Sequence, residues 1–517
     1  MAEGGVNVAL GNVDPPDNWE VHFKDTVTGG AYLNNQKLVE ILVREGSDRI
    51  FDLEEYGAVF DRTPEGKIAQ RAFGKQSYRR TCYASDRTGH EFMATLTEEV
   101  RRRDIDVMEE VFVTNLLKAN GRVVGALGVD YKTSDFLLFK AKATVLAAGG
   151  TGRIYKFTSN AAQDTGDGYA MAYRARASLI DMEMFQFHPT GMLVPESARG
   201  ILVTEAVRGE GGILTNKDNE RFMKRYDPKL MELSGRDVVA RSIATEVLEE
   251  RGTPQGGVYL SVAHLEPHII EERLRTMFKQ FLDTGVDIRK EPMEVAPTAH
   301  HQMGGLFVDE AAATDLKGLW AAGEVAGGIQ GGNRLGGNAL LDTQVFGKRA
   351  GENAAKFASG VGQASVERKD VEKEIKHVQG FVDRRRGVRP VEVKRRLAEL
   401  MWSKVGIFRT RNELQEAVQE IEKMQREQLP QLYITGTGAR YNHELIEALE
   451  IENMVLTAEM IARAALMREE SRGAHFRRDF PKTDNKNWLA SIIVRQENNR
   501  MIFSKAPVVM TLLKLEA

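Results

Sequence analysis

Two short apolar runs that end in glycine most constrain how this chain can fold. The first is residues 143–150, with the sequence ATVLAAGG, and the second is residues 318–324, with the sequence GLWAAGE. A buried strand that stops at glycines lets a large cofactor approach the backbone at the end of the strand. Further glycines follow the second run up to Gly337. We therefore expect both runs to be strands of a sheet that lies against a cofactor.

Length, charge and cysteine content exclude several kinds of protein. A chain of 517 residues is expected to form two to four domains. Its net charge of -3 argues against a nucleic-acid partner. No apolar run approaches the roughly 18 residues of a membrane span. With Cys82 as its one cysteine, the chain cannot hold an iron–sulfur cluster on several thiolates, so any metal relay for electrons belongs to a partner.

Local patterns predict several elements along the chain. Residues 18–49 have a mostly helical pattern, and two β-branched runs around Asn120-Gly121 predict a hairpin between Val111 and Tyr131. Residues of about 190–295 are expected to form an inserted cap. From about residue 361 the pattern is one of long charged helices, one of which we expect to stop at Pro430. The last 50 residues have an irregular pattern.

Five longer motifs occur in order along the chain. They are Phe187–Gly191 (FHPTG), Thr204–Gly212 (TEAVRGEGG), Gly235–Ser242 (GRDVVARS), Thr298–Gly305 (TAHHQMGG) and Gly332–Asn338 (GNRLGGN). Together they resemble the flavoprotein subunits of the succinate dehydrogenase/fumarate reductase family, and the resemblance extends from Ala2 to about Trp488.

The resemblance implies an α/β, Rossmann-like FAD-binding fold, incomplete at its N-terminus, with an inserted α+β capping domain and a C-terminal helical domain. It places the FAD-binding domain in residues 1–190 and 298–360, the capping domain in 191–297, the helical domain in 361–465 and a C-terminal domain in 466–517. Family members open with a G-x-G-x-x-G turn that binds the FAD pyrophosphate, and this sequence contains none. We therefore expect Met1 to be an internal methionine of a longer chain. Whether the FAD is covalently attached stays open.

The substrates that the resemblance implies are succinate and fumarate, which are four-carbon dianions. A site for them needs cations at both ends, and arginine suits a carboxylate because its fork can bind both oxygens. By resemblance, Arg334 and His300 hold one carboxylate, while His188 and Thr204 hold the other, with Gly4 beside the substrate.

The resemblance also assigns a path for protons. Arg236 corresponds to the acid that protonates a substrate carbon, and Glu205 and Arg208 correspond to the residues that resupply it. Taken singly, Arg236 would be a helix-terminus ion pair, Glu205 with Arg208 a solvated helix pair, and His188 a structural turn histidine. Only the joint pattern favours the functional interpretation.

The predicted cofactor site is also assigned by resemblance. It has glycines against the flavin ring, a strand end at the adenosine side, two acidic residues, and the start of a helix that points at the flavin, where a helix N-terminus stabilises negative charge. Asp167 could equally be an ordinary helix cap. The adjacent His300 and His301 do not predict a metal site, because no carboxylate lies at ligand spacing. The residues are Gly4, Gly5, Ala147, Ala148, Gly149, Asp167, Glu324, Asn338, Ala339 and Leu340.

The resemblance implies an enzyme that interconverts succinate and fumarate by hydride transfer with flavin N5 and passes electrons to an iron–sulfur subunit. Three alternatives stay open: the corresponding chain of a thiol-dependent (coenzyme M/coenzyme B) fumarate reductase, an L-aspartate oxidase, and a fragment that binds no FAD. Residues 81–90 resemble the dehydrogenase version of this segment better than that of the oxidase. The expected location is the cytoplasm, with attachment to the inner face of the cytoplasmic membrane through a partner left open.

Overall fold

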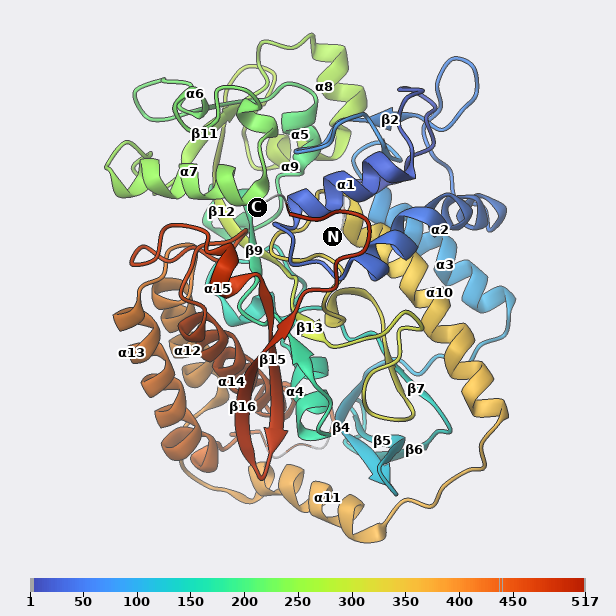
Figure 1. Cartoon of the computed structure of the whole chain (residues 1–517). Helices are drawn as coiled ribbons and strands as arrows, with labels where there is room; N and C mark the ends of the chain where they lie inside the picture. Colours follow the sequence, from blue (N-terminus) through green and yellow to red (C-terminus); the bar gives the residue numbers. More distant parts are fainter. Residues whose placement is uncertain (1–3, 437, 439, 516–517) are drawn as a thin grey trace.

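The structure is a computed structural model that describes residues 4–436, 438 and 440–515. Two parallel strands, β7 (Thr144–Leu146) and β14 (Leu319–Ala321), correspond to the two glycine-terminated runs. Helix α10 (Asn338–Ser359) packs against β14 and against α2 (Gln36–Glu55), and it crosses the molecule diagonally in Figure 1. The α/β expectation for this part of the chain is confirmed.

The remaining elements of this part of the chain are a hairpin and several further helices and strands. Strands β4 (Val111–Ala119) and β5 (Arg122–Asp130) form the predicted hairpin, and Asn120 and Gly121 have φ angles of 51° and 72°. These positive φ values are what a type I′ turn requires. Strand β6 (Phe136–Lys140) extends the sheet. The other elements here are β1 (Val6–Asn7), α1 (Trp19–Gly29), β2 (Gln70–Arg71), β3 (Thr81–Cys82), α3 (Thr88–Arg102) and α4 (Asp167–Arg174).

The cap is a four-stranded antiparallel sheet covered by helices, in green at the top of Figure 1. Its strand order is β10 (Ile213–Thr215), β11 (Val258–Ser261), β12 (Met293–Gln302) and β9 (Phe185–Met192). The predicted domain limits at residues 190 and 297 fall inside β9 and β12, so these two strands join the cap to the cofactor-binding part. The helices of the cap are α5 (Glu205–Gly209), α6 (Met223–Tyr226), α7 (Arg236–Leu248), α8 (Pro267–Arg273) and α9 (Arg275–Asp283).

Four longer helices form the region expected to be helical. They are α11 (Arg368–Asp383), α12 (Pro390–Lys404), α13 (Arg411–Lys423) and α14 (His443–Met467). Leu414, Val418 and Ile421 are buried and form the apolar face of α13. The α-helix ends at Lys423 and continues as a π turn over residues 424–428, so Pro430 lies in the turn that follows rather than at the helix end.

The end of the chain is more regular than its sequence pattern suggested. After α15 (Asn485–Trp488), strands β15 (Ala490–Glu497) and β16 (Arg500–Pro507) form an antiparallel hairpin. Strand β15 pairs with β8 (Leu179–Ile180), which in turn pairs with β13 (Gly305–Leu306). The expectation of an irregular C-terminus was wrong for residues 485–507, because the hairpin is held by a strand that lies far away in the sequence. Among the described residues, no helix has the length and apolar character needed to cross a membrane.

Candidate active site

A cavity of about 240 Å³ lies where the cap meets the start of α10. Its walls bring together segments that are far apart in sequence, from the first described residues to the first turn of α10. The lining residues are Gly4, Gly5, Phe73, Ser159, Asn160, Ala161, Asp164, His188, Leu202, Thr204, Glu205, Arg236, His300, His301, Glu324, Arg334, Gly337, Ala339 and Leu340.

Arg236 and Glu205 form a buried ion pair on the cap side of the cavity. The Arg236 Nε and Nη2 groups donate to Glu205 Oε2 at 2.8 and 2.6 Å. Arg208 Nη2 lies 3.9 Å from Glu205 Oε1, and the Gly74 N–H donates to the same oxygen at 2.8 Å. Burial raises the pKa of Glu205, but Arg236 and Arg208 outweigh it, so the pKa lies below its usual value. Glu205 is therefore an anion held between two cations.

This geometry differs from the ordinary solvated helix pair that residues 205 and 208 could have formed. Glu205 and Arg208 are 2% and 1% exposed, because the short helix α5 is buried between the cap sheet and the cavity. Arg236 is the first residue of α7, so the helix start places its guanidinium at the cavity wall. The three predicted proton-path residues are thus in contact with one another, and two of them line the cavity.

Gln186 is a residue of this site that sequence reasoning missed. Its Oε1 accepts from Arg236 Nη1 at 3.1 Å, while its Nε2 donates to Asn333 Oδ1 and to the Arg334 carbonyl, both at 2.8 Å. It is fully buried on β9, one residue before the FHPTG motif. Its position two residues before His188 on the same strand was the one hint in the sequence, since alternate residues of a strand share a face.

Arg334, His188 and His300 bring donors to the cavity. His188 Nε2 and Arg334 Nε are buried without a hydrogen-bond partner among the described residues. The His188 and His300 rings have centroids 5.0 Å apart, and His300 Nδ1 lies 2.8 Å from Ser159 Oγ. Thr204 is the N-cap of α5, and its hydroxyl accepts from the Ala206 N–H. The four predicted substrate-holding side chains therefore do meet at one cavity.

The charges at these residues favour an anionic ligand. Burial lowers the pKa of His188 well below its usual value, and Arg236 and Arg208 add to the effect, so this ring is neutral at pH 7. Burial and the neighbouring Arg236 lower the pKa of Arg334 to about 9, which leaves it charged at neutral pH. A buried cation whose N–H group has no hydrogen-bond acceptor raises the free energy of the folded state unless an anion pairs with it. A carboxylate in the cavity would supply that partner.

Both adjacent histidines face the cavity because β12 carries a β-bulge. The pairing of β12 with β9 shifts between Ala299 and His301, so His300 is an extra residue and both rings lie on the same side. His301 Nδ1 lies 3.0 Å from Glu324 Oε2, and the Gln302 N–H donates to Glu324 Oε1 at 2.9 Å. Glu324 is thus held in place at the cavity wall.

The start of α10 offers the other wall, and it fits the flavin end of an FAD. Gly337 is the N-cap of α10 with φ 88°, and it supplies no side-chain cap to the first-turn N–H groups. Ala339 and Leu340 of that turn line the cavity, as do Gly4 and Gly5. Uncapped N–H groups at the positive end of a 22-residue helix suit an electron-rich ring edge.

Other predicted cofactor residues lie outside this cavity lining. Ala147 and Ala148 follow β7 and are exposed, and a side chain at Gly149 would meet Asp164 Oδ1 at 2.7 Å. Asp167 starts α4 and accepts from Asn453 of α14 at 2.6 Å, and Asn338 turns inward to His22, Asn7 and Thr26. The roles of Ala147, Ala148 and Gly149 toward the adenosine side, of Asp167 near the FAD and of Asn338 toward the flavin stay predictions.

Comparison with known families matches both halves of the chain. Residues 1–340 match the model of an FAD binding domain, and residues 394–517 match that of the fumarate reductase flavoprotein C-terminal domain. The two matches cover the cavity, the helices α12–α14 and the C-terminal hairpin.

Whole-chain relatives agree with these domains. A chain of the fumarate reductase (CoM/CoB) of Methanothermobacter marburgensis is 56% identical over 96% of this chain and 90% of its own length. The succinate dehydrogenase flavoprotein subunit of Coxiella burnetii is 38% identical over 94% of this chain and 86% of its own. A solved structure of an E. coli quinol fumarate reductase FrdA variant superposes with a TM-score of 0.93 at 33% identity, covering 99% of this chain and 90% of that one. This chain belongs to the succinate dehydrogenase/fumarate reductase family of FAD-dependent oxidoreductase flavoprotein subunits.

Proposed function

We propose that this chain interconverts succinate and fumarate at the cavity between the cap and α10. The observation that carries the proposal is the arrangement of donors in one small cavity. Arg334, His300, His188 and Thr204 all line its wall, and so does the Arg236–Glu205 pair. A four-carbon dicarboxylate has two anionic ends that need such donors and a central bond that needs an acid beside it.

Arg334 and the neutral histidines hold the substrate. Arg334 pairs with one carboxylate, and His188 Nε2 donates to the other, because both nitrogens are buried without another partner among the described residues. Holding two carboxylates at fixed positions allows one of them to be twisted out of the plane of the double bond. That twist makes the carbon of fumarate a better hydride acceptor, and the cations stabilise the charge that develops. Bound FAD supplies the hydride donor or acceptor.

Arg236 gives a proton to the substrate carbon during fumarate reduction and takes one during succinate oxidation. Arginine is a weak acid, so its position and a quick resupply matter more than its intrinsic pKa. Glu205 contacts both Arg236 and Arg208, which makes it the group through which a proton returns to Arg236.

An iron–sulfur subunit of the same complex takes or supplies the electrons in this proposal. Cys82 is the one cysteine and is fully buried in β3, so thiolates of this chain cannot hold a cluster. Any membrane attachment would then come through that partner, on the cytoplasmic side.

A second candidate concerns the source of the electrons. The relative named as a CoM/CoB fumarate reductase is 56% identical to this chain, against 38% for the succinate dehydrogenase flavoprotein of Coxiella burnetii. We propose on this ground that the working direction is fumarate reduction with electrons from two thiol coenzymes, delivered through the partner. Both candidate functions use the same substrate cavity. They differ in the partner subunit and in the electron donor.

The visible spectrum of the purified chain loaded with FAD tests the site. Succinate is expected to bleach the flavin band under anaerobic conditions, and fumarate to restore it after chemical reduction, whereas L-aspartate does neither. Arg334→Met is expected to abolish both responses while keeping the flavin. A bound flavin that ignores both dicarboxylates, or a chain that takes up no FAD, would refute the proposal. Fumarate reduction by the complex with coenzyme M and coenzyme B, but not with a reduced quinone, would identify the thiol-dependent enzyme.

A further inference from the structure

A second cavity lies behind the wall that carries the substrate-binding histidines. It has a volume of about 410 Å³ and is formed between β9 and β12, the C-terminal half of α7, and the segment that follows α12. On β9, His188 faces the substrate cavity and the preceding residue, Phe187, faces this one. At residues 187 and 188 the two cavities therefore lie on opposite sides of β9, as neighbouring residues of a strand do.

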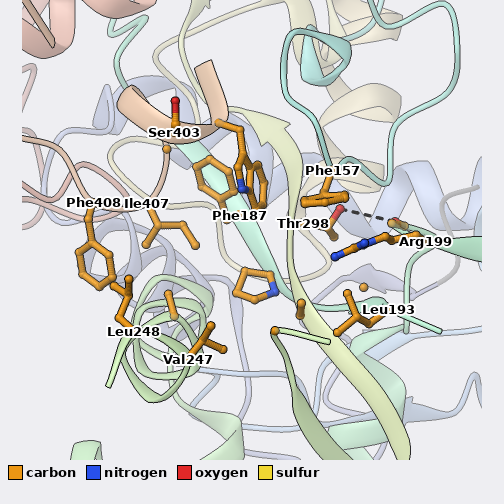
Figure 2. Close-up of a pocket in the computed structure, with 18 of the residues that line it drawn as sticks. Phe157, Phe187, Leu193, Arg199, Val247, Leu248, Thr298, Ser403, Ile407 and Phe408 are labelled. Atoms are coloured by element: carbon orange, nitrogen blue, oxygen red, sulfur yellow. Dashed lines mark hydrogen bonds between the residues drawn. The ribbon is translucent and has the colours of Figure 1, made fainter. Parts of the chain in front are cut away.

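Aromatic rings cover much of this second cavity (Figure 2). The Phe157 and Trp402 rings are T-shaped with centroids 4.9 Å apart, and Phe187 and Trp402 are 6.0 Å apart. Phe408 and Ile407 form the side of the cavity away from Arg199. Val247 and Leu248 of α7 lie below them in Figure 2. Leu248 is 57% exposed, so the cavity can be reached from solvent. Such walls suit the apolar part of a ligand.

Arg199 brings one charge to this apolar space. In Figure 2 its guanidinium lies on the side opposite Phe408, and its Cζ lies 4.3 Å from the centre of the Phe157 ring. Nη1 donates to Glu196 Oε2 at 3.0 Å, but Nε is buried and has no hydrogen-bond partner within the described part of the chain. A buried guanidinium N–H without an acceptor is unfavourable, and a ligand carboxylate would satisfy it.

Other charged groups at the cavity are already engaged. Glu413 accepts from the Thr410 hydroxyl at 2.7 Å, and the Arg478 guanidinium stacks 4.4 Å from the centre of the Phe408 ring. Ser403 donates its hydroxyl to the carbonyl of Glu399. Arg199 Nε is thus the cavity's one buried side-chain donor or acceptor that lacks a partner among the described lining residues.

We propose that this second cavity is a binding site for a small amphipathic carboxylate, with its carboxylate on Arg199 and its apolar chain or ring among Phe157, Phe187 and Trp402. The volume exceeds the roughly 150 Å³ that is enough for benzene and falls in the usual range of about 300–1,000 Å³ for ligand sites. The short dicarboxylates proposed for the substrate cavity lack the apolar part that these walls suit. A charged head and an apolar body match what the lining offers.

Binding of 4-phenylbutyrate to the FAD-loaded protein tests this site. We expect a saturable change in tryptophan fluorescence, since Trp402 forms part of the wall, with the dissociation constant measured by calorimetry. The uncharged analogue 4-phenyl-1-butanol is expected to bind about tenfold more weakly, because it cannot pair with Arg199. Saturating succinate should not displace the probe, since succinate occupies the other face of the wall.

Two variants and one control assign the binding to this cavity. Arg199→Gln should weaken 4-phenylbutyrate about tenfold and leave the alcohol unchanged. Ala244→Phe, which fills the cavity from α7, should weaken both probes. Arg225→Gln, which removes an exposed arginine that pairs with Glu220 and Glu246 outside the cavity lining, should weaken neither. No saturable binding, displacement by succinate, or binding that survives both cavity variants would overturn the proposal.

Discussion

Gln186 connects the two active-site arginines through both ends of its side-chain amide. It accepts from Arg236 and donates to the backbone of Arg334, so it fixes the distance between the proposed proton donor and the proposed substrate anchor. Gln186→Leu keeps the side-chain size and removes three hydrogen bonds. We expect kcat/KM for fumarate to fall about 10- to 100-fold, because each partner left unpaired costs about 1–3 kcal/mol.

The separate effects on kcat and KM distinguish a misplaced acid from a misfolded protein. Gln186→Leu should lower kcat more than it raises KM, because the acid is displaced while the histidines and Arg334 still hold the substrate. Gln419→Leu makes the same change on the exposed face of α13 and should leave both constants unaltered. A variant with unchanged kcat and an unchanged thermal midpoint would show that Arg236 does not depend on Gln186.

At the level of single residues, the sequence predicted the charged groups of the site better than the residues that hydrogen-bond to them. Arg236, Glu205 and His188 lie in long motifs, and the structure places them at one cavity. Gln186 and Ser159 lie outside those motifs. No local sequence pattern shows that a polar residue on a buried strand or loop belongs to a ligand-binding site. Asp167 was assigned to the cofactor site by resemblance, and its side chain accepts a hydrogen bond from Asn453 of α14, so its role stays a prediction.

At the level of elements, the start of α10 depends on one glycine. Gly337 has φ 88°, and a Cβ placed there would meet Asn7 Oδ1 at 2.1 Å. Gly337→Ala would therefore impose both backbone strain, of about 1–2 kcal/mol, and a clash that moves β1 or the helix start. Since these two segments lie at the flavin end of the cavity, we expect less bound flavin as well as a lower thermal midpoint.

Gly285 provides a matched control for that change. It has φ 91°, but a Cβ there has nothing within 4 Å. Gly285→Ala should therefore show the backbone strain alone, with full flavin content. The two variants are compared by the ratio of flavin to protein absorbance and by thermal melting. Equal flavin content in both would mean that the contact with Asn7 does not position the cofactor.

The elements that the sequence predicted were those set by local patterns. The hairpin at Asn120-Gly121 needs only a turn with positive φ between two β-branched runs, and it formed as expected. The β15–β16 hairpin was missed because β15 is stabilised by β8, far away in the sequence. The β-bulge at His300 was missed for a similar reason, since it arises from the pairing of β12 with β9.

On the scale of the whole molecule, Arg468 ties three regions together: the segment after α14, the segment between β8 and β9, and the start of β15, where it donates to the Trp488 and Ala490 carbonyls. It follows α14, and its guanidinium pairs with Glu183 at 2.6 Å, with Glu470 at 3.0 Å and with Asp181 at 3.6 Å, all fully or nearly buried. Arg468→Met would leave Glu183 and Asp181 without their cation, while Glu470 would keep Arg472. We expect a loss of about 3–5 kcal/mol in the free energy of unfolding, as for other buried pairs that lose one partner.

Arg463 on α14 is the control for this prediction. It pairs with Glu459 and Glu422, and its side chain is 31% exposed, so Arg463→Met should cost no more than about 1 kcal/mol. Thermal unfolding of the FAD-loaded variants, followed by flavin release and by circular dichroism, compares the two. Similar midpoints for both variants would show that the buried network does not hold the three regions together.

The way the substrate cavity is assembled also sets when it can exist during synthesis. Its lining begins at Gly4 and is complete only at Leu340 of α10. A ribosome that adds about 5–20 residues per second needs on the order of 20–70 seconds to cover that distance. From the synthesis of His188 onward, the emerging chain has histidines and then arginines of the site but no closed cavity around them. Redox chemistry therefore cannot begin on a half-made protein, because the last wall of the site arrives late in translation.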